Sequence, residues 1–128
     1  MYRYVAVFLG GGLGAALRFA VATFMLRFYS GLFPLGTFTI NISGSFAIGL
    51  LMTLFLNREA THPAWRLFLI VGVLGGYTTF SSFEWETFVA LRGGGSLVAA
   101  LNVLLSVALG FVGVAAGAWL AARFGLNR

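Results

Sequence analysis

The sequence of 128 residues contains no cysteine and no lysine, and only 9% of its residues are charged. The absence of cysteine excludes disulfides, thiolate nucleophiles and cysteine-based metal sites. Its one histidine, His62, lies beside Pro63 between two apolar segments, where we expect a solvated loop residue rather than a metal ligand. The sequence offers no set of nucleophile, base and orienting group, so an enzyme is not expected.

Long apolar segments are abundant instead, because hydrophobic residues make up 60% of the chain. Four segments reach or exceed the roughly 20 residues that span a bilayer, and the connections between them are too short for a soluble domain. We therefore predict an all-α membrane protein with one four-helix domain over residues 1–128. The expected helices are approximately 4–25, 36–56, 65–91 and 96–124. The first is too long and too glycine-rich for a cleaved signal peptide.

The net charge of +5 comes from arginines, most of which lie at the ends of the expected helices. In a soluble protein this excess would suggest nucleic acid. Here the expected partner is the lipid headgroup region, and no nucleic-acid partner is expected. The positive-inside rule favours cytoplasmic termini, while both orientations stay open. The face that carries both termini would hold five arginines and the opposite face two: Arg3, Arg58, Arg66, Arg123 and Arg128 against Arg27 and Arg92.

Two polar residues fall within apolar segments. A charge such as Arg18 costs ~2.5 to 3.5 kcal/mol inside a membrane span, so it faces a bundle interior or an aqueous cavity unless it snorkels to the interface. Arg18 is thus either an interfacial anchor or a source of positive potential for an anion. Asn41, in the middle of the second segment, either joins helices by hydrogen bonds or coordinates an ion.

Glycines recur at the GxxxG spacing in three of the expected helices. This spacing lets helix backbones approach closely in lipid. We expect close packing at three pairs: Gly10/Gly14, Gly72/Gly76 and Gly113/Gly117.

The third segment contains the run Gly75-Gly76-Tyr77-Thr78-Thr79-Phe80-Ser81-Ser82-Phe83. Its glycines tolerate non-helical backbone, and its hydroxyls can replace lost backbone hydrogen bonds. We therefore predict a break near the middle of this helix. A broken membrane helix presents carbonyl groups at the end of its first half and N–H groups at the start of its second, which gives a cation site and an anion site close together.

Phe80 and Phe83 are three residues apart and share a helical face. They are either packing residues or present the positive edges of their rings to an anion. Glu84 and Glu86 follow the break, and we expect them at the interface or in a vestibule. A proton-coupled or cation-binding role is the alternative for Glu86.

At these residues the sequence resembles the Fluc (CrcB) family of fluoride channels. Residues 36–49 match the family run GTxxxNxxGSFxxG, residues 75–83 match GGxTTFSxF, and residues 14–19 are similar to its first-helix arginine motif. The resemblance covers essentially the whole chain in the same order and spacing. Ser82 stands where threonine is common, and Asn102 occupies a position that varies in the family.

The resemblance implies a dual-topology homodimer of two antiparallel subunits with two fluoride pores, in a bacterial-type plasma (inner) membrane. Such a channel would export cytoplasmic fluoride passively and reduce its toxicity. Backbone carbonyls of Gly75 and Thr78 from both subunits would hold one central, structural Na⁺ that is not transported. Arg18 would give electrostatic or packing support, and Glu86 would lie at a vestibule. The implied pore residues are Asn41, Phe80, Phe83, Thr79, Ser81 and Ser106.

Two other classes share features with this chain. A small multidrug transporter is also a four-helix, dual-topology dimer, but it needs an acid in its first helix, where this chain carries Arg18 and no acid. A membrane scaffold without transport activity would need only the glycine faces, and it would leave the run from Gly75 to Phe83 unexplained.

Overall fold

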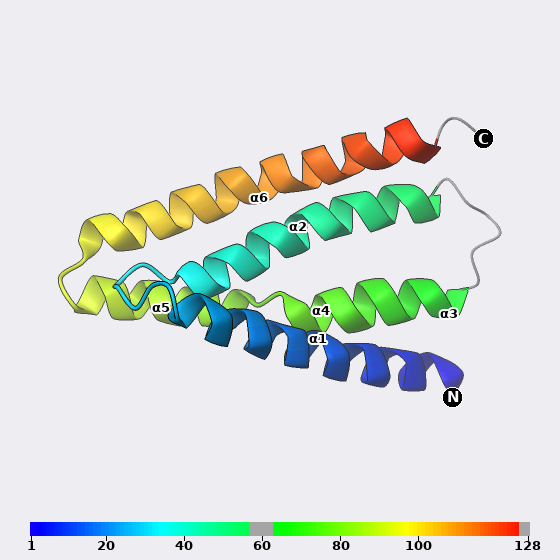
Figure 1. The fold of residues 1–128 in the computed structure, drawn as a ribbon, viewed down its shortest axis with the longest axis horizontal. Coiled ribbons are helices and arrows are strands. Elements are labelled where there is room, and N and C mark those ends of the chain that lie inside the picture. Colours follow the sequence, from blue (N-terminus) through cyan, green and yellow to red (C-terminus); the bar gives the residue numbers. More distant parts are fainter. Residues whose placement is uncertain (57–62, 126–128) are drawn as a thin grey trace.

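The computed structural model describes residues 1–56 and 63–125, and within these ranges every regular element is a helix (Figure 1). Helix α1 spans Tyr2–Leu26, α2 spans Leu35–Leu56 and α6 spans Ser96–Gly125. The third segment comprises α3 (Pro63–Arg66), the π-helical η1 (Leu67–Leu74), α4 (Gly75–Tyr77) and α5 (Phe80–Arg92). The largest differences from the expected ranges are two residues, at the starts of the first and third segments. His62, Arg58 and Arg128, to which the sequence analysis refers, lie outside the described residues.

Four helical segments are long and apolar enough to cross a membrane: residues Tyr2–Leu26, Leu35–Phe55, Pro63–Arg92 and Ser96–Arg123. The third of these is interrupted between α4 and α5. The predictions of an all-α membrane protein and of a break near the middle of the third helix are therefore confirmed. The chain is a multi-pass membrane protein.

The helices form two close pairs. Helix α1 runs beside the first half of the third segment, and α2 runs beside α6 (Figure 1). The beginning of α1 and the end of α6 lie at the same end of the molecule, as four crossings require. The third segment also contacts α2, because Asn41 of α2 bonds Thr79 at the interruption.

Contact between α1 and the third segment is made by backbone. The pair Gly10/Gly14 of α1 faces the pair Gly72/Gly76, and a Cβ atom on Gly14 would overlap the carbonyl oxygen of Val73. Since that oxygen belongs to a helix backbone, it cannot move aside as a side chain would. The close packing predicted from the GxxxG spacing is what the structure has here.

Contact between α2 and α6 is also made by backbone. A Cβ atom on Gly117 would overlap the carbonyl oxygen of Phe46, and one on Gly49 would overlap that of Val114. Glycines on both helices thus allow the two backbones to touch. Helix α6 is held against α2 along this contact, which fixes where its polar residues lie relative to the break.

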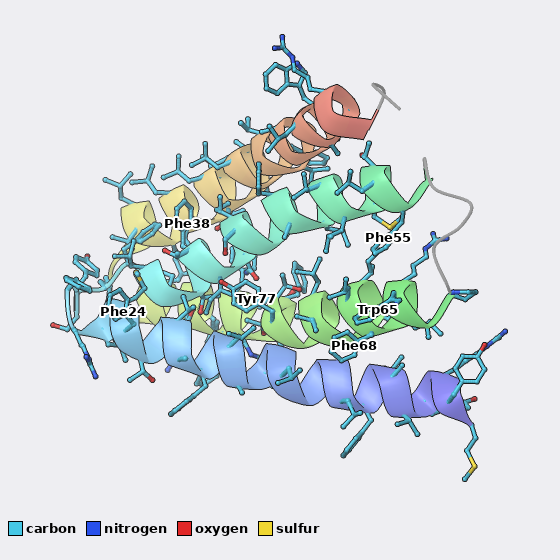
Figure 2. All side chains as sticks on the ribbon, turned by 45° about the vertical axis from the view of Figure 1, so that its right-hand side comes forward. Phe24, Phe38, Phe55, Trp65, Phe68 and Tyr77 are labelled. Carbon is cyan, nitrogen blue, oxygen red and sulfur yellow. The ribbon has the colours of Figure 1, made fainter. Side chains whose placement is uncertain are left out.

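Apolar side chains stand outward from all the long helices (Figure 2). Among the residues that the structure describes, the buried apolar side chains are few: Ile40, Leu74, Ala90, Ala99 and Ala121. An exposed apolar surface of this extent is expected where lipid or another protein covers it.

Candidate functional site

The interruption of the third segment is made by two threonines. Thr78 has φ −76° and ψ 157°, and Thr79 has φ −151° and ψ 122°, so both are extended. Gly75 and Gly76, which tolerate non-helical backbone, do not adopt it here, because both lie in helix α4 and Gly75 has φ −63° and ψ −35°. The role of Gly76 is close approach, since a Cβ atom there would overlap the carbonyl oxygen of Gly11 in α1.

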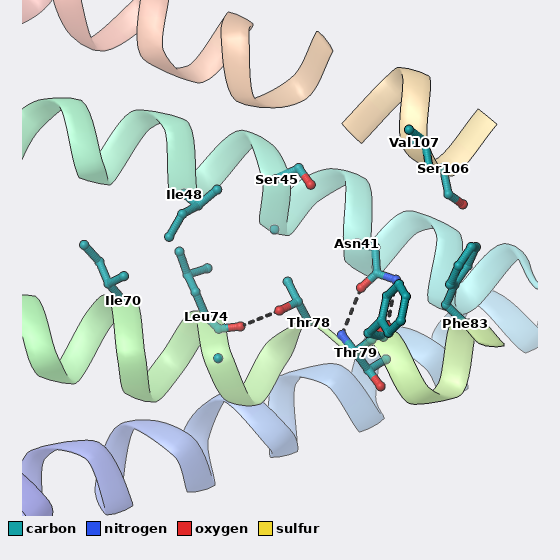
Figure 3. A pocket seen from close by; sticks show the side chains of 13 residues that line it. Asn41, Ser45, Ile48, Ile70, Leu74, Thr78, Thr79, Phe83, Ser106 and Val107 are labelled. Carbon is teal, nitrogen blue, oxygen red and sulfur yellow. Dashed lines mark hydrogen bonds between the residues drawn. The ribbon is translucent and has the colours of Figure 1, made fainter. Parts of the chain in front are cut away.

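Asn41 of α2 holds the break by its side-chain amide. Its Nδ2 donates to the carbonyl oxygen of Thr79 at 2.9 Å, and its Oδ1 accepts from the N–H of Thr79 at 2.9 Å (Figure 3). The amide therefore satisfies both backbone groups of an extended residue, much as a neighbouring β-strand would. Each amide nitrogen carries two hydrogens, so one N–H of Asn41 is not used in this pair.

The break removes the usual hydrogen-bond donors from the carbonyl groups of residues 75–78. In a continuous helix the N–H of Thr79 would bond the carbonyl of Gly75, but it bonds Asn41 instead. The N–H of Ser82 would bond the carbonyl of Thr78, but it donates to Oγ1 of Thr79 at 3.3 Å, which caps α5. The carbonyl oxygens of Gly75 and Thr78, at the two ends of this set, are thus left without their helical donors.

A cavity of about 430 Å³ opens at the break. Asn41 and Ser106 lie toward the α5 end, Ser45 and Thr78 lie near the middle, and Ile48 and Ile70 lie toward the α3 end (Figure 3). The rings of Phe80 and Phe83 are 5.7 Å apart with an interplanar angle of 38°. The cavity brings together most of the residues that the sequence singles out: Asn41, Gly75, Thr78, Thr79, Phe80, Phe83 and Ser106.

Comparison with known proteins identifies the family of the chain. The family model described as CrcB-like protein, Camphor Resistance (CrcB), matches residues 5–118. This chain belongs to the CrcB family. The resemblance drawn from the motifs is therefore confirmed.

Individual relatives of this CrcB chain are similar over nearly their whole length. A protein of Solibacter usitatus named fluoride-specific ion channel FluC is 52% identical over 121 residues, which cover 94% of this chain and 99% of the relative. A protein of Methylobacterium nodulans with the same name is 48% identical, with 98% of this chain and 100% of the relative covered. One of Coxiella burnetii, also with that name, is 47% identical, with 93% and 94% covered.

Three candidate residues of the CrcB chain lie away from the cavity at the break. Ser81 is exposed on α5. Arg18 is half-buried on α1 and makes no hydrogen bond or ion pair with the described part of the chain. Glu86 lines a separate cavity of about 390 Å³ with Thr37 and Trp85, and its Oε2 is buried without a hydrogen-bond partner among the described residues.

Sequence reasoning missed residues that shape the site from neighbouring turns. Gly44 of α2 is buried against the methyl group of Thr78, and a Cβ atom there would overlap it. Tyr77 reaches from α4 toward α2, where its hydroxyl lies 2.9 Å from Oγ of Ser43 (Figure 2). Thr87 of α5 donates to the carbonyl of Phe83 at 2.7 Å. Gly44 could have been found from its place in the GSF motif. The contact of Tyr77 depends on a neighbouring helix, whereas the bond of Thr87 lies within α5.

Proposed function

We propose that this chain is the subunit of a fluoride channel that lets cytoplasmic fluoride leave the cell passively and so reduces its toxicity. The observation that carries the proposal is the cavity at the helix break, where Asn41 and hydroxyl groups meet Phe80 and Phe83 inside an apolar wall. The name of the relatives, fluoride-specific ion channel, supports it.

Fluoride is small and strongly hydrated, so a narrow passage must replace its water with hydrogen-bond donors. The cavity supplies the unused N–H of Asn41 and the beginning of α5, whose first backbone N–H groups have no partner within the helix. The edges of Phe80 and Phe83 offer weak positive charge. Such weak contacts suit conduction, because an ion that binds too tightly does not leave.

A structural Na⁺ fits the donors at the break. The carbonyl oxygens of Gly75 and Thr78 have lost their helical donors, and oxygen atoms are the ligands that hard cations prefer. The described residues hold no group of three or more His, Cys, Asp or Glu side chains, so backbone carbonyl and hydroxyl oxygens would have to hold a cation at this place. Two such pairs, one from each of two subunits, would tie two broken helices together.

An antiparallel homodimer would cover the break. Gly75 and Phe80 are both exposed in the single chain, and Phe80 has 71% of its surface exposed. Non-helical backbone at membrane depth is tolerated only when protein or a water-filled cavity surrounds it. A second copy in the inner membrane, in the opposite orientation, would enclose this side of the cavity and complete a passage for the ion.

Other classes of protein are less well supported. Helix α1 (Tyr2–Leu26) carries no acid, which a small multidrug transporter would use to exchange protons for cations. A scaffold would have no use for the cavity at the break. The relatives are named as ion channels, so transport without catalysis is part of the proposal.

The test is fluoride efflux from proteoliposomes that contain the purified protein, followed with a fluoride electrode and repeated with chloride. We expect rapid, fluoride-selective efflux, which falls when another cation replaces Na⁺ throughout purification.

Phe80→Ile should abolish efflux and leave the oligomer intact. Phe111→Ile is the matched control, since Phe111 has 74% of its surface exposed on α6 away from the cavity, and its efflux should be native. A folded dimer without efflux would refute the channel.

A further inference from the structure

Asn102 of α6 has only 1% of its surface exposed. An unpaired amide at such a position would cost several kcal/mol in an apolar environment, on the order of 2–7. Both ends of this amide are bonded, because Nδ2 donates to Oγ1 of Thr87 at 2.7 Å and Oδ1 accepts from Oγ of Ser106 at 3.3 Å. Asn102 thus joins α5 to α6 one turn from the cavity at the break.

The direction of these bonds follows from the proton count. Thr87 gives its one hydroxyl proton to the carbonyl of Phe83 at 2.7 Å, so Oγ1 can only accept from Asn102. The NH₂ group of Asn102 must therefore face Thr87, and its oxygen must face Ser106. The one hydroxyl proton of Ser106 is in turn committed to Asn102.

This commitment changes what Ser106 offers to the cavity that it lines. A hydroxyl whose proton is engaged presents lone pairs, which do not bind an anion. To donate to a passing anion, Ser106 must break its hydrogen bond to Asn102. This bond is 3.3 Å long, whereas the bond from Asn102 to Thr87 and the bond from Thr87 to Phe83 are each 2.7 Å. Asn102 and the anion compete for one proton.

We propose that Asn102 is a positioning residue that weakens the hold of Ser106 on the permeating anion and so keeps the anion mobile. The inference rests on the proposed fluoride conduction. Conduction needs binding that is strong enough for entry and weak enough for exit, and a competing acceptor lowers the strength of one donor without removing it. The role is distinct from lining the passage, because Asn102 acts only through Ser106.

The experiment measures fluoride efflux against fluoride concentration for native protein and for Asn102→Leu, which has a similar volume and no acceptor. With the proton of Ser106 released, the concentration at half-saturation should fall about fivefold, which is the effect of one ordinary hydrogen bond, and the maximal efflux should fall as well. Adding Ser106→Ala to Asn102→Leu should reverse the fall in the half-saturation concentration, because the released donor is then absent. The effect of Ser106→Ala should be larger in the variant than in the native background.

Ala99→Gly is the matched control for loosened packing of α6, since Ala99 is 5% exposed one turn before Asn102. The fluoride concentration at half-saturation in Ala99→Gly should equal that of the native protein. If Asn102→Leu does not fold, Asn102→Thr replaces it, because a threonine can bond its own helix and is too short to bridge Thr87 and Ser106. If the folded Asn102 variant has the same maximal efflux and the same half-saturation concentration as the native protein, the inference about Asn102 is overturned and the proposed function stands. If the native protein shows no efflux, the proposed function itself is overturned.

Discussion

At the scale of single residues, Asn41 shows how one side chain makes a broken helix tolerable in a membrane. Thr79 lies 38 residues away in sequence, and its N–H and carbonyl both bond the Asn41 amide. Without water in the bilayer core, each of these groups needs a partner in the protein. The sequence left two interpretations of Asn41 open, interhelical hydrogen bonding and ion coordination. They are compatible, since the amide joins α2 to the break and keeps one N–H for an ion.

Replacing Asn41 by leucine should therefore do more than remove a donor. Two buried backbone groups of Thr79 would each lose a partner, at a cost of about 1–3 kcal/mol per group. The N–H of Thr79 would be free to return to the carbonyl of Gly75, which would straighten the helix and close the site. We expect Asn41→Leu to reduce fluoride efflux about tenfold or more, measured in proteoliposomes alongside the oligomeric state.

Ile42→Leu is the control for this variant, because Ile42 is the next residue of α2, lines a different cavity and keeps its volume after the change. Its efflux should be native. Native efflux from Asn41→Leu would show that the Asn41 amide is not needed to hold the break.

At the scale of helices, α1 and the first half of the third segment approach so closely that their backbones touch. The backbone of α1 touches η1 and α4 through glycines, and any side chain at Gly14 would meet the carbonyl of Val73. Gly12, half a turn earlier on α1, has no atom within 4 Å of where its Cβ atom would lie. Two glycines of one motif thus have opposite roles in packing.

This contrast gives a prediction about stability. Gly14→Ala should push α1 away from the third segment and destabilise the protein by about 1–3 kcal/mol, as overpacking usually does. Gly12→Ala should leave stability unchanged or raise it, because alanine is the better helix former. Thermal melting of the two purified variants in the same detergent measures the difference. Equal melting temperatures would mean that the contact at Gly14 is not tight.

Helices and break could be predicted from the sequence because both are local properties. Four apolar runs of bilayer length give the helices, and the Gly75–Phe83 run gives the place of the break. The identity of the extended residues could not be predicted, because it depends on Asn41 in another helix. The π-helical turns of η1 and the link between Thr87 and Asn102 were likewise not predicted, since each arises from packing between segments.

At the scale of the whole molecule, more arginines belong to the end that carries both termini than to the opposite end. Within the described residues, Arg3, Arg66 and Arg123 lie toward the end where α1 begins, and Arg27 and Arg92 lie toward the other. The positive-inside rule acts through differences in such counts. Over the full sequence the difference is five against two and favours cytoplasmic termini, whereas an antiparallel dimer requires both orientations. The orientation of the chain is therefore a direct test of the antiparallel dimer.

Orientation can be measured directly because the native chain has no cysteine. Ser96→Cys places one thiol where α6 begins, and Tyr4→Cys places one at the opposite end, near the beginning of α1 (Figure 1). With a membrane-impermeant maleimide on intact spheroplasts, a dual-topology protein should be labelled at about half of its molecules in both variants, because each end faces outward in half of the chains. Permeabilised membranes should give complete labelling. Full labelling of one variant with none of the other would establish a single orientation, and an antiparallel dimer could not then form.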